Sequence, residues 1–177
     1  MKLNIAMWRK AAWELIKMDS KQEWDALDVI SKWLIATRSA VTTVTIYSCI
    51  IAGALAWRDG YFAWLPWIIV TLGLFIAHGT NNLLNDLTDY RKGVDKDNYF
   101  RTQYGAQPIQ QGLWTEKQLL TYAAVTGLIA LACGIALTLL RGPAVLALLA
   151  AGAFFVLFYT WPLKYIGLGE IAVIIVW

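Results

Sequence analysis

The sequence is poor in charge and in the residue types that build most soluble catalytic and metal sites. Of its 177 residues, 15% are charged, whereas soluble domains carry about 25%. It has two cysteines and one histidine, and no Gly-rich phosphate loop, zinc-ligand spacing or nucleophile elbow. The low charge argues against a water-soluble globule, and the 59% hydrophobic share excludes an intrinsically disordered chain.

The apolar residues gather in four long runs that contain no charged residue. The runs cover residues 39–57, 60–85, 118–140 and 142–163, which makes 19, 26, 23 and 22 residues. Each run is long enough to cross a hydrocarbon core of about 30 Å as a helix. The predicted fold class is therefore an all-α membrane protein, a polytopic transmembrane helix bundle.

The last apolar segment is shorter than these four. Only seven residues follow Glu170, and seven residues at about 1.5 Å each cannot cross a membrane. The sequence thus predicts four full spans plus a truncated fifth, in the front portion of a longer protein. A re-entrant or docked terminal helix is the alternative.

Positive charge is unevenly distributed between the segments that connect the runs. Residues 1–38 contain seven Lys and Arg residues and residues 86–117 contain five, whereas the connections near residues 58 and 141 contain one each. Positive charge that flanks membrane helices stays in the cytoplasm. We therefore expect a multi-pass protein of the cell membrane whose N-terminus and Asp-rich loop are cytoplasmic.

Two parts are predicted: a cytoplasmic or interfacial segment at residues 1–38, and a transmembrane helical domain at 39–177 with a cytoplasmic loop at 90–116. In the first part, apolar residues recur at helical spacing among basic ones, as in a helix that lies in the headgroup region. These residues are Leu3, Met7, Ala11, Leu15 and Met18. A helix that packs beneath the bundle fits the same pattern. Tryptophans near the run ends, Trp114 among them, are interpreted as interfacial anchors.

The end of the second run carries the most informative polar residues. Asn82, Asn85, Asp86 and Asp89 fall within about 100° of arc on a helix, while the leucines between them point elsewhere. Ionisable groups at membrane depth are costly and usually face a protein interior or a wet cavity. We therefore expect these four residues, the polar stripe, to line a cavity that opens on the cytoplasmic side.

The oxygen ligands of the stripe suit Mg²⁺, which takes one or two protein carboxylates and leaves positions for water and substrate phosphate. With Arg38 before the first run and more cations in the following loop, the same mouth could hold a diphosphate bridged by Mg²⁺. Three alternatives remain open. Asp86 and Asp89 could form a solvated helix end that pairs with Arg91 and Lys92. The stripe could also be the cation site of a transporter half, or the chain could be a non-catalytic membrane partner.

Three ordered segments resemble the UbiA superfamily of intramembrane aromatic prenyltransferases. The first, at residues 85–89, reads NDLTD and is followed by Gly93 and Asp95, similar to the family's first Asp-rich motif. The second reads QPIQQG at 107–112 and resembles the segment that leads into the family's third helix. The third reads YTWPLKYIGLGE at 159–170 and is similar to its turn between helices four and five. The sequence that begins at Asp89, DYRKGVD, most resembles members that prenylate dihydroxynaphthoate in menaquinone synthesis.

The resemblance implies roles for single residues. Those implied to hold Mg²⁺ and the diphosphate are Asn82, Asp86 and Asp89. Those implied to bind substrate or order the loop around it are Arg38, Asn85, Asp95 and Lys164. Tyr159 joins the two aspartates as a catalytic residue, because it is implied to face the reacting allylic carbon. Gln107 departs from the pattern, since many members have Arg before this proline.

The implied function is Mg²⁺-dependent transfer of a polyprenyl group from an allylic polyprenyl diphosphate to an aromatic acceptor, as in quinone or related prenyl-lipid biosynthesis. The expected partners are these two substrates and the lipid bilayer, with no nucleic acid. The family has nine transmembrane helices and a second Asp-rich motif, whereas no Asp follows Asp97 here. We therefore expect an N-terminal half that lacks a motif needed for activity, and whose site a C-terminal half or second subunit completes.

Overall fold

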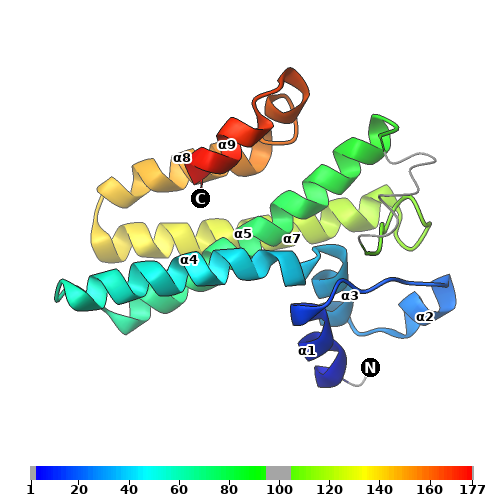
Figure 1. Cartoon of the computed structure of the whole chain (residues 1–177), viewed down its shortest axis with the longest axis horizontal. Helices are drawn as coiled ribbons and strands as arrows, with labels where there is room; N and C mark the ends of the chain where they lie inside the picture. Colours follow the sequence, from blue (N-terminus) through cyan, green and yellow to red (C-terminus); the bar gives the residue numbers. More distant parts are fainter. Residues whose placement is uncertain (1–2, 95–104, 177) are drawn as a thin grey trace.

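The computed structural model describes residues 3–94 and 105–176, and the described residues are helical with no strand. Within the described part of the chain, three helices are long and apolar enough to cross a membrane: α4 (Ser39–Arg58), α5 (Trp64–Arg91) and α7 (Glu116–Arg141). They run alongside one another, and α8 (Ala144–Phe158) folds back beside them (Figure 1). The predicted all-α membrane fold is confirmed.

The fourth predicted span is shorter as a helix than as an apolar run. Helix α8 has 15 residues, about 22 Å at 1.5 Å per residue, because the chain turns at residues 159–162 into the 3₁₀ helix η1 (Leu163–Ile166). A final helix, α9 (Gly169–Val176), follows and packs on η1 and α8. The number of full spans stays a prediction.

Helix α5 is the centre of the bundle, in contact with α4, α7 and α8. Two glycines let its neighbours approach closely. A Cβ at Gly73 would lie 2.9 Å from the Cβ of Cys133 on α7, and a Cβ at Gly79 would lie 2.7 Å from the ring of Trp33. Small residues at helix contacts are typical of membrane bundles, where packing rather than the hydrophobic effect drives association.

Side-chain hydrogen bonds join α5 to each of these neighbours. The Thr45 hydroxyl of α4 lies 2.8 Å from Nδ1 of His78, and the hydroxyls of Thr80 and Thr126 lie 2.8 Å apart between α5 and α7. The amide nitrogen of Asn81 donates to the Val156 carbonyl of α8 at 3.0 Å. Such bonds hold helices together where water is excluded, so His78 has a packing role here.

The N-terminal part contains three short helices instead of one amphipathic helix. They are α1 (Ile5–Trp13), α2 (Lys21–Ala26) and α3 (Val29–Ala36), and they lie at one end of the bundle (Figure 1). Helix α1 ends because Glu14 is extended, so the helical spacing predicted through Leu15 and Met18 is wrong beyond Trp13. Ala11 and Met18 are buried, whereas Trp13 is 70% exposed.

The buried hydrophobic core lies at the end of the bundle where α1, α2 and α3 lie. It combines residues of the N-terminal helices with Leu83 and Leu87 of α5, the segment 105–114 and the start of α7. Trp114 belongs to this core: it is 5% exposed, stacks on Tyr122 and meets Trp24 edge-on. The interpretation of Trp114 as an interfacial anchor is therefore wrong.

Asp28 connects helices α1 and α3. Its carboxylate caps α3 through the backbone of Ile30 and Ser31 and accepts the indole N–H of Trp8 on α1 at 3.0 Å. Burial alone would raise the pKa of this carboxyl, but hydrogen bonds from Ser31, Trp8 and the Asn4 backbone outweigh burial and lower the pKa to about 2. The ionised form therefore stabilises this part of the fold.

We expect the stabilisation by Asp28 to be lost in acid. Its folded pKa of about 2 lies below the ordinary aspartate pKa of 3.8, so the contribution is complete above pH 4 and disappears as pH falls through 2. The shift corresponds to about 2 kcal/mol. Measured by denaturant unfolding in detergent, Asp28→Ala should be less stable than the wild type at pH 7, and this gap should narrow below pH 4.

The exposed Asp25, which pairs with Lys21 on one face of α2, provides the control. Asp25→Ala should change stability by less than about 0.5 kcal/mol at any pH. A gap for Asp28→Ala that persists unchanged down to pH 2 would contradict the assigned role.

Candidate functional site

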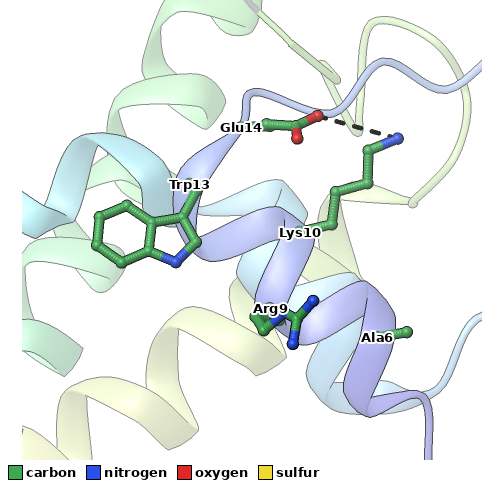
Figure 2. A pocket seen from close by; sticks show the side chains of 5 residues that line it. All are labelled: Ala6, Arg9, Lys10, Trp13 and Glu14. Carbon is green, nitrogen blue, oxygen red and sulfur yellow. Dashed lines mark ion pairs between the residues drawn. The ribbon is translucent and has the colours of Figure 1, made fainter.

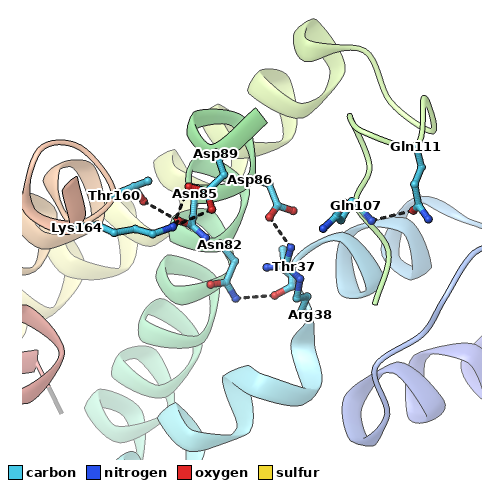
Figure 3. A network of polar contacts seen from close by, with 10 residues as sticks. All are labelled: Thr37, Arg38, Asn82, Asn85, Asp86, Asp89, Gln107, Gln111, Thr160 and Lys164. Atoms are coloured by element: carbon cyan, nitrogen blue, oxygen red, sulfur yellow. Dashed lines mark hydrogen bonds and ion pairs between the residues drawn. The ribbon is translucent and has the colours of Figure 1, made fainter. Parts of the chain in front are cut away.

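The polar stripe forms as predicted on the last turns of α5. Asp86 and Asp89 are 4% and 0% exposed, and Asn82 and Asn85 are half-buried. All four side chains project from one side of the helix (Figure 3). The acids thus face the protein interior, neither lipid nor bulk solvent, as expected for costly ionisable groups in a membrane protein.

Arg38 reaches Asp86 from the corner between α3 and α4. One guanidinium nitrogen, Nη2, lies 2.5 Å from Oδ1 of Asp86, and the Arg38 side chain is 15% exposed. Among the described residues, Arg38 is the one non-glycine with a positive φ, at 52°. A left-handed conformation costs a non-glycine residue about 1 kcal/mol or more, and it persists where the surrounding structure over-determines it.

Asn82 secures that corner. Its amide nitrogen donates to the Thr37 carbonyl at 2.7 Å (Figure 3). Thr37 is itself fully buried, against the space that a Cβ at Gly79 would occupy. The side-chain oxygen of Asn82, as placed here, is the atom that could ligate a cation, so holding the corner and coordinating a metal are compatible.

Lys164 pairs with Asp89 from the opposite direction. Its ammonium lies 2.8 and 2.9 Å from the two carboxylate oxygens of Asp89 and 3.2 Å from the side-chain oxygen of Asn85. The Tyr165 hydroxyl donates to Asp89 at 3.1 Å. Because Lys164 and Tyr165 belong to η1, these bonds bring the turn after α8 onto the end of α5.

The alternative of a solvated helix end is wrong. Arg91 forms its ion pair with Glu116, at 2.6 Å, and the Lys92 ammonium lies 4.2 Å from the centre of the Trp161 ring. Both acids of the stripe are buried and pair with cations from distant elements. Lys92 thereby adds a second contact between the end of α5 and the turn that carries Lys164.

The remaining predicted residues are placed as follows. Tyr159 lies half-buried at the C-terminal end of α8, and the tyrosine whose hydroxyl contacts the stripe is Tyr165. Tyr165 lies within the third resembling segment, but its spacing alone gave no reason to choose it. Asp95 lies outside the described residues.

Gln107 is a buried polar residue near the stripe. It is 3% exposed, and neither its side-chain oxygen nor its side-chain nitrogen has a hydrogen-bond partner within the described ranges. Figure 3 shows its side chain extending toward Asp86 and Arg38. The Gln111 side chain holds the Gln107 backbone N–H at 2.9 Å, so the side chain is presented from a fixed backbone.

Surface hollows formed by described residues lie outside the stripe. One, of about 460 Å³, is lined by Tyr90, Gly93, Ile109, Gln110 and Gly112. The other, of about 270 Å³, lies on the outer face of α1 beside Arg9, Lys10 and Trp13 (Figure 2). Neither hollow is lined by Asp86 or Asp89, so the cavity predicted beside the stripe stays a prediction.

The stripe offers oxygen donors to a metal ion. Over residues 3–94 and 105–176, no group of three His, Cys, Asp or Glu side chains is placed to hold a metal. The stripe supplies two carboxylates and two amide oxygens, a set that fits Mg²⁺ when substrate phosphate and water complete its shell. In this structure each carboxylate is occupied by a cationic side chain.

The family model described as the UbiA prenyltransferase family matches residues 46–177, most of the chain, and the chain therefore belongs to this family. The matched range includes the stripe and Lys164, whereas Arg38 precedes it. No curated protein and no solved structure is significantly similar to the chain. Family membership and the apolar helices make this a multi-pass membrane protein of the intramembrane prenyltransferase class. Such enzymes use a prenyl diphosphate and an aromatic acceptor and are generally Mg²⁺-dependent.

We expect Gln107→Met to stabilise the protein. The substitution keeps the size of the side chain and removes two buried polar atoms that lack partners, which should raise the free energy of unfolding by about 1 kcal/mol. Denaturant titration in detergent measures the change. Gln111→Met, the same change four residues along, should destabilise by about 1 kcal/mol, because it removes the acceptor of the Gln107 N–H. A loss of stability in Gln107→Met would contradict this account of the buried amide.

Proposed function

We propose that the polar stripe binds the diphosphate of an allylic polyprenyl diphosphate with Mg²⁺, and that the protein transfers the polyprenyl group to an aromatic acceptor. The observation that carries the proposal is the pairing of two buried acids with two cations from separate elements. Buried ion pairs are poor stabilisers compared with apolar residues of the same size. Their presence at the end of an apolar helix therefore points to a ligand that uses both signs of charge.

A diphosphate with its metal ion matches this arrangement of charges. Asp86 and Asp89, with the side-chain oxygen of Asn82, would hold Mg²⁺, while Arg38 and Lys164 would turn to diphosphate oxygens. Each acid would thus exchange its cationic side-chain partner for Mg²⁺, and each cation would exchange its acid for a diphosphate oxygen. No side chain would be left with an uncompensated buried charge.

Arg38 and Lys164 would do the electrostatic part of the reaction. As the allylic carbon–oxygen bond breaks, negative charge develops on the leaving diphosphate, and cations held in place by the fold stabilise it. Mg²⁺, when bound, supplies Lewis-acid stabilisation of the same charge. An electron-rich aromatic carbon then forms the new carbon–carbon bond to the allylic cation and loses its proton. Tyr159 would face the allylic carbon, and the apolar helix faces would exclude water.

Several narrower assignments belong to this proposal. The resemblance of the segment that begins at Asp89 supports a dihydroxynaphthoate acceptor and a role in menaquinone synthesis. The distribution of Lys and Arg supports a cytoplasmic location for the N-terminus and the stripe. A second Asp-rich motif, from a C-terminal half or second subunit, would complete the metal site. For α1, Arg9 and Lys10 beside the exposed Trp13 support an interfacial position.

The arrangement of charges argues against a cation pathway of a transporter half. A permeating cation at Asp86 or Asp89 would displace Arg38 or Lys164, which lie at 2.5 and 2.8 Å, and unlike Mg²⁺ with a diphosphate it would bring no anion to pair with the displaced side chain. Titration of the purified full-length protein with Mg²⁺ and geranylgeranyl diphosphate separates the two functions. Mg²⁺-dependent diphosphate binding supports the transferase, whereas cation flux through proteoliposomes without diphosphate supports the transporter.

We expect Asp86→Asn and Asp89→Asn each to lower prenyl transfer by at least about 100-fold, because removal of a preorganised charge from an active site costs about 3 kcal/mol or more. The measurement is transfer of radiolabelled prenyl groups by full-length protein with Mg²⁺, geranylgeranyl diphosphate and dihydroxynaphthoate. Asp59→Asn, in the exposed turn between α4 and α5, should leave turnover unchanged. Wild-type turnover in both stripe variants would refute the assignment of the site.

A further inference from the structure

Ser39 is the residue after Arg38, and it connects the corner that carries Arg38 to helix α1. It is the first residue of α4, and its hydroxyl donates to the Ala11 carbonyl at 2.6 Å. Ser39 and Ala11 are each 1% exposed. Figure 1 shows α1 beside the beginning of α4. This buried hydrogen bond joins residues 28 positions apart and lies next to the one left-handed non-glycine residue described above.

The corner that carries Arg38 is thus held from two sides. On the α5 side, Asn82 binds the Thr37 carbonyl at 2.7 Å, and on the α1 side, Ala11 binds the Ser39 hydroxyl. A non-glycine residue stays in the left-handed region where its surroundings over-determine it. These bonds hold the residues on either side of Arg38, and the Arg38 side chain reaches Asp86 from between them.

We propose that Ser39 is a positioning residue for Arg38, and that α1 is thereby a working part of the prenyl diphosphate site. Ser39 touches neither acid of the stripe; it acts through the conformation of its neighbour. The consequence for substrate binding rests on the proposed function, whereas the consequence for the Arg38–Asp86 ion pair does not.

A role limited to attaching α1 makes a different prediction. If Ser39 only anchors α1, its removal lowers stability and weakens ligand binding to the same degree whatever residue occupies position 38. If Ser39 positions Arg38, its removal has no effect on binding once the guanidinium is absent. A double-mutant cycle between the two positions distinguishes these cases.

The first experiment measures equilibrium binding of geranylgeranyl diphosphate with Mg²⁺ to the full-length protein. Ser39→Ala should weaken binding about fivefold, the effect of one hydrogen bond, with the KM of the aromatic acceptor unchanged. In the Arg38→Ala background, the same change should have no further effect. Ser48→Ala, the same substitution at a half-buried position of α4 whose hydroxyl donates to the Val44 carbonyl of its own helix, should bind as the wild type. Equal losses in both backgrounds would overturn the proposal.

The second experiment needs no substrate. The coupling between Arg38 and Asp86 is measured from the unfolding of Arg38→Ala, Asp86→Ala and the double variant, with Ser39 present and with Ser39→Ala. The coupling should fall by at least about half when Ser39 is replaced. Unchanged coupling would overturn the positioning role. A wild-type protein that binds no prenyl diphosphate would instead refute the proposed function, and the unfolding cycle would still decide the role of Ser39.

Discussion

The structure depends on the pairing of two buried carboxylates with cations that come from elsewhere in the chain. Asp86 and Asp89 leave water only because Arg38 and Lys164 reach them, 48 and 75 residues away in sequence. An unpaired buried charge costs several kcal/mol, so both partners must arrive together with the end of α5. The α3–α4 corner and the turn after α8 meet this requirement, because they bring Arg38 and Lys164 to the end of α5.

Two kinds of packing operate along the same helix. In its membrane-spanning part, α5 contacts its neighbours through glycines and single hydrogen bonds such as Thr45–His78. Lipid is as apolar as the side chains, so the hydrophobic effect does not drive helices together there. At its other end, Leu83 and Leu87 enter a core built with the N-terminal helices and the segment 105–114. That core is driven together by the hydrophobic effect, and its residues Leu83 and Leu87 alternate along α5 with those of the stripe.

Periodicity and composition predicted the parts of the structure that are repetitive. The charge-free runs correspond to α4, α5 and α7, and the spacing of the four stripe residues placed them on one side of α5. The predictions are wrong where one sequence pattern fits two different structural roles. Trp114 fits an interfacial anchor and a core residue equally well, and only packing against Trp24 and Tyr122 decides between them. The end of α1 at Trp13 cannot be read from the sequence pattern, because the apolar spacing continues into an extended segment.

By itself, the sequence determined that this is an α-helical membrane protein with acids and amides on one side of a long helix, because helix length, hydropathy and a 100° turn per residue are local properties. Only the tertiary structure decided which cations pair with which acids. Arg91 and Lys92 were the nearest candidates along the chain, yet they bind Glu116 and the Trp161 ring. The partners of a buried charge depend on which distant elements the fold brings together, and local sequence patterns do not predict those contacts.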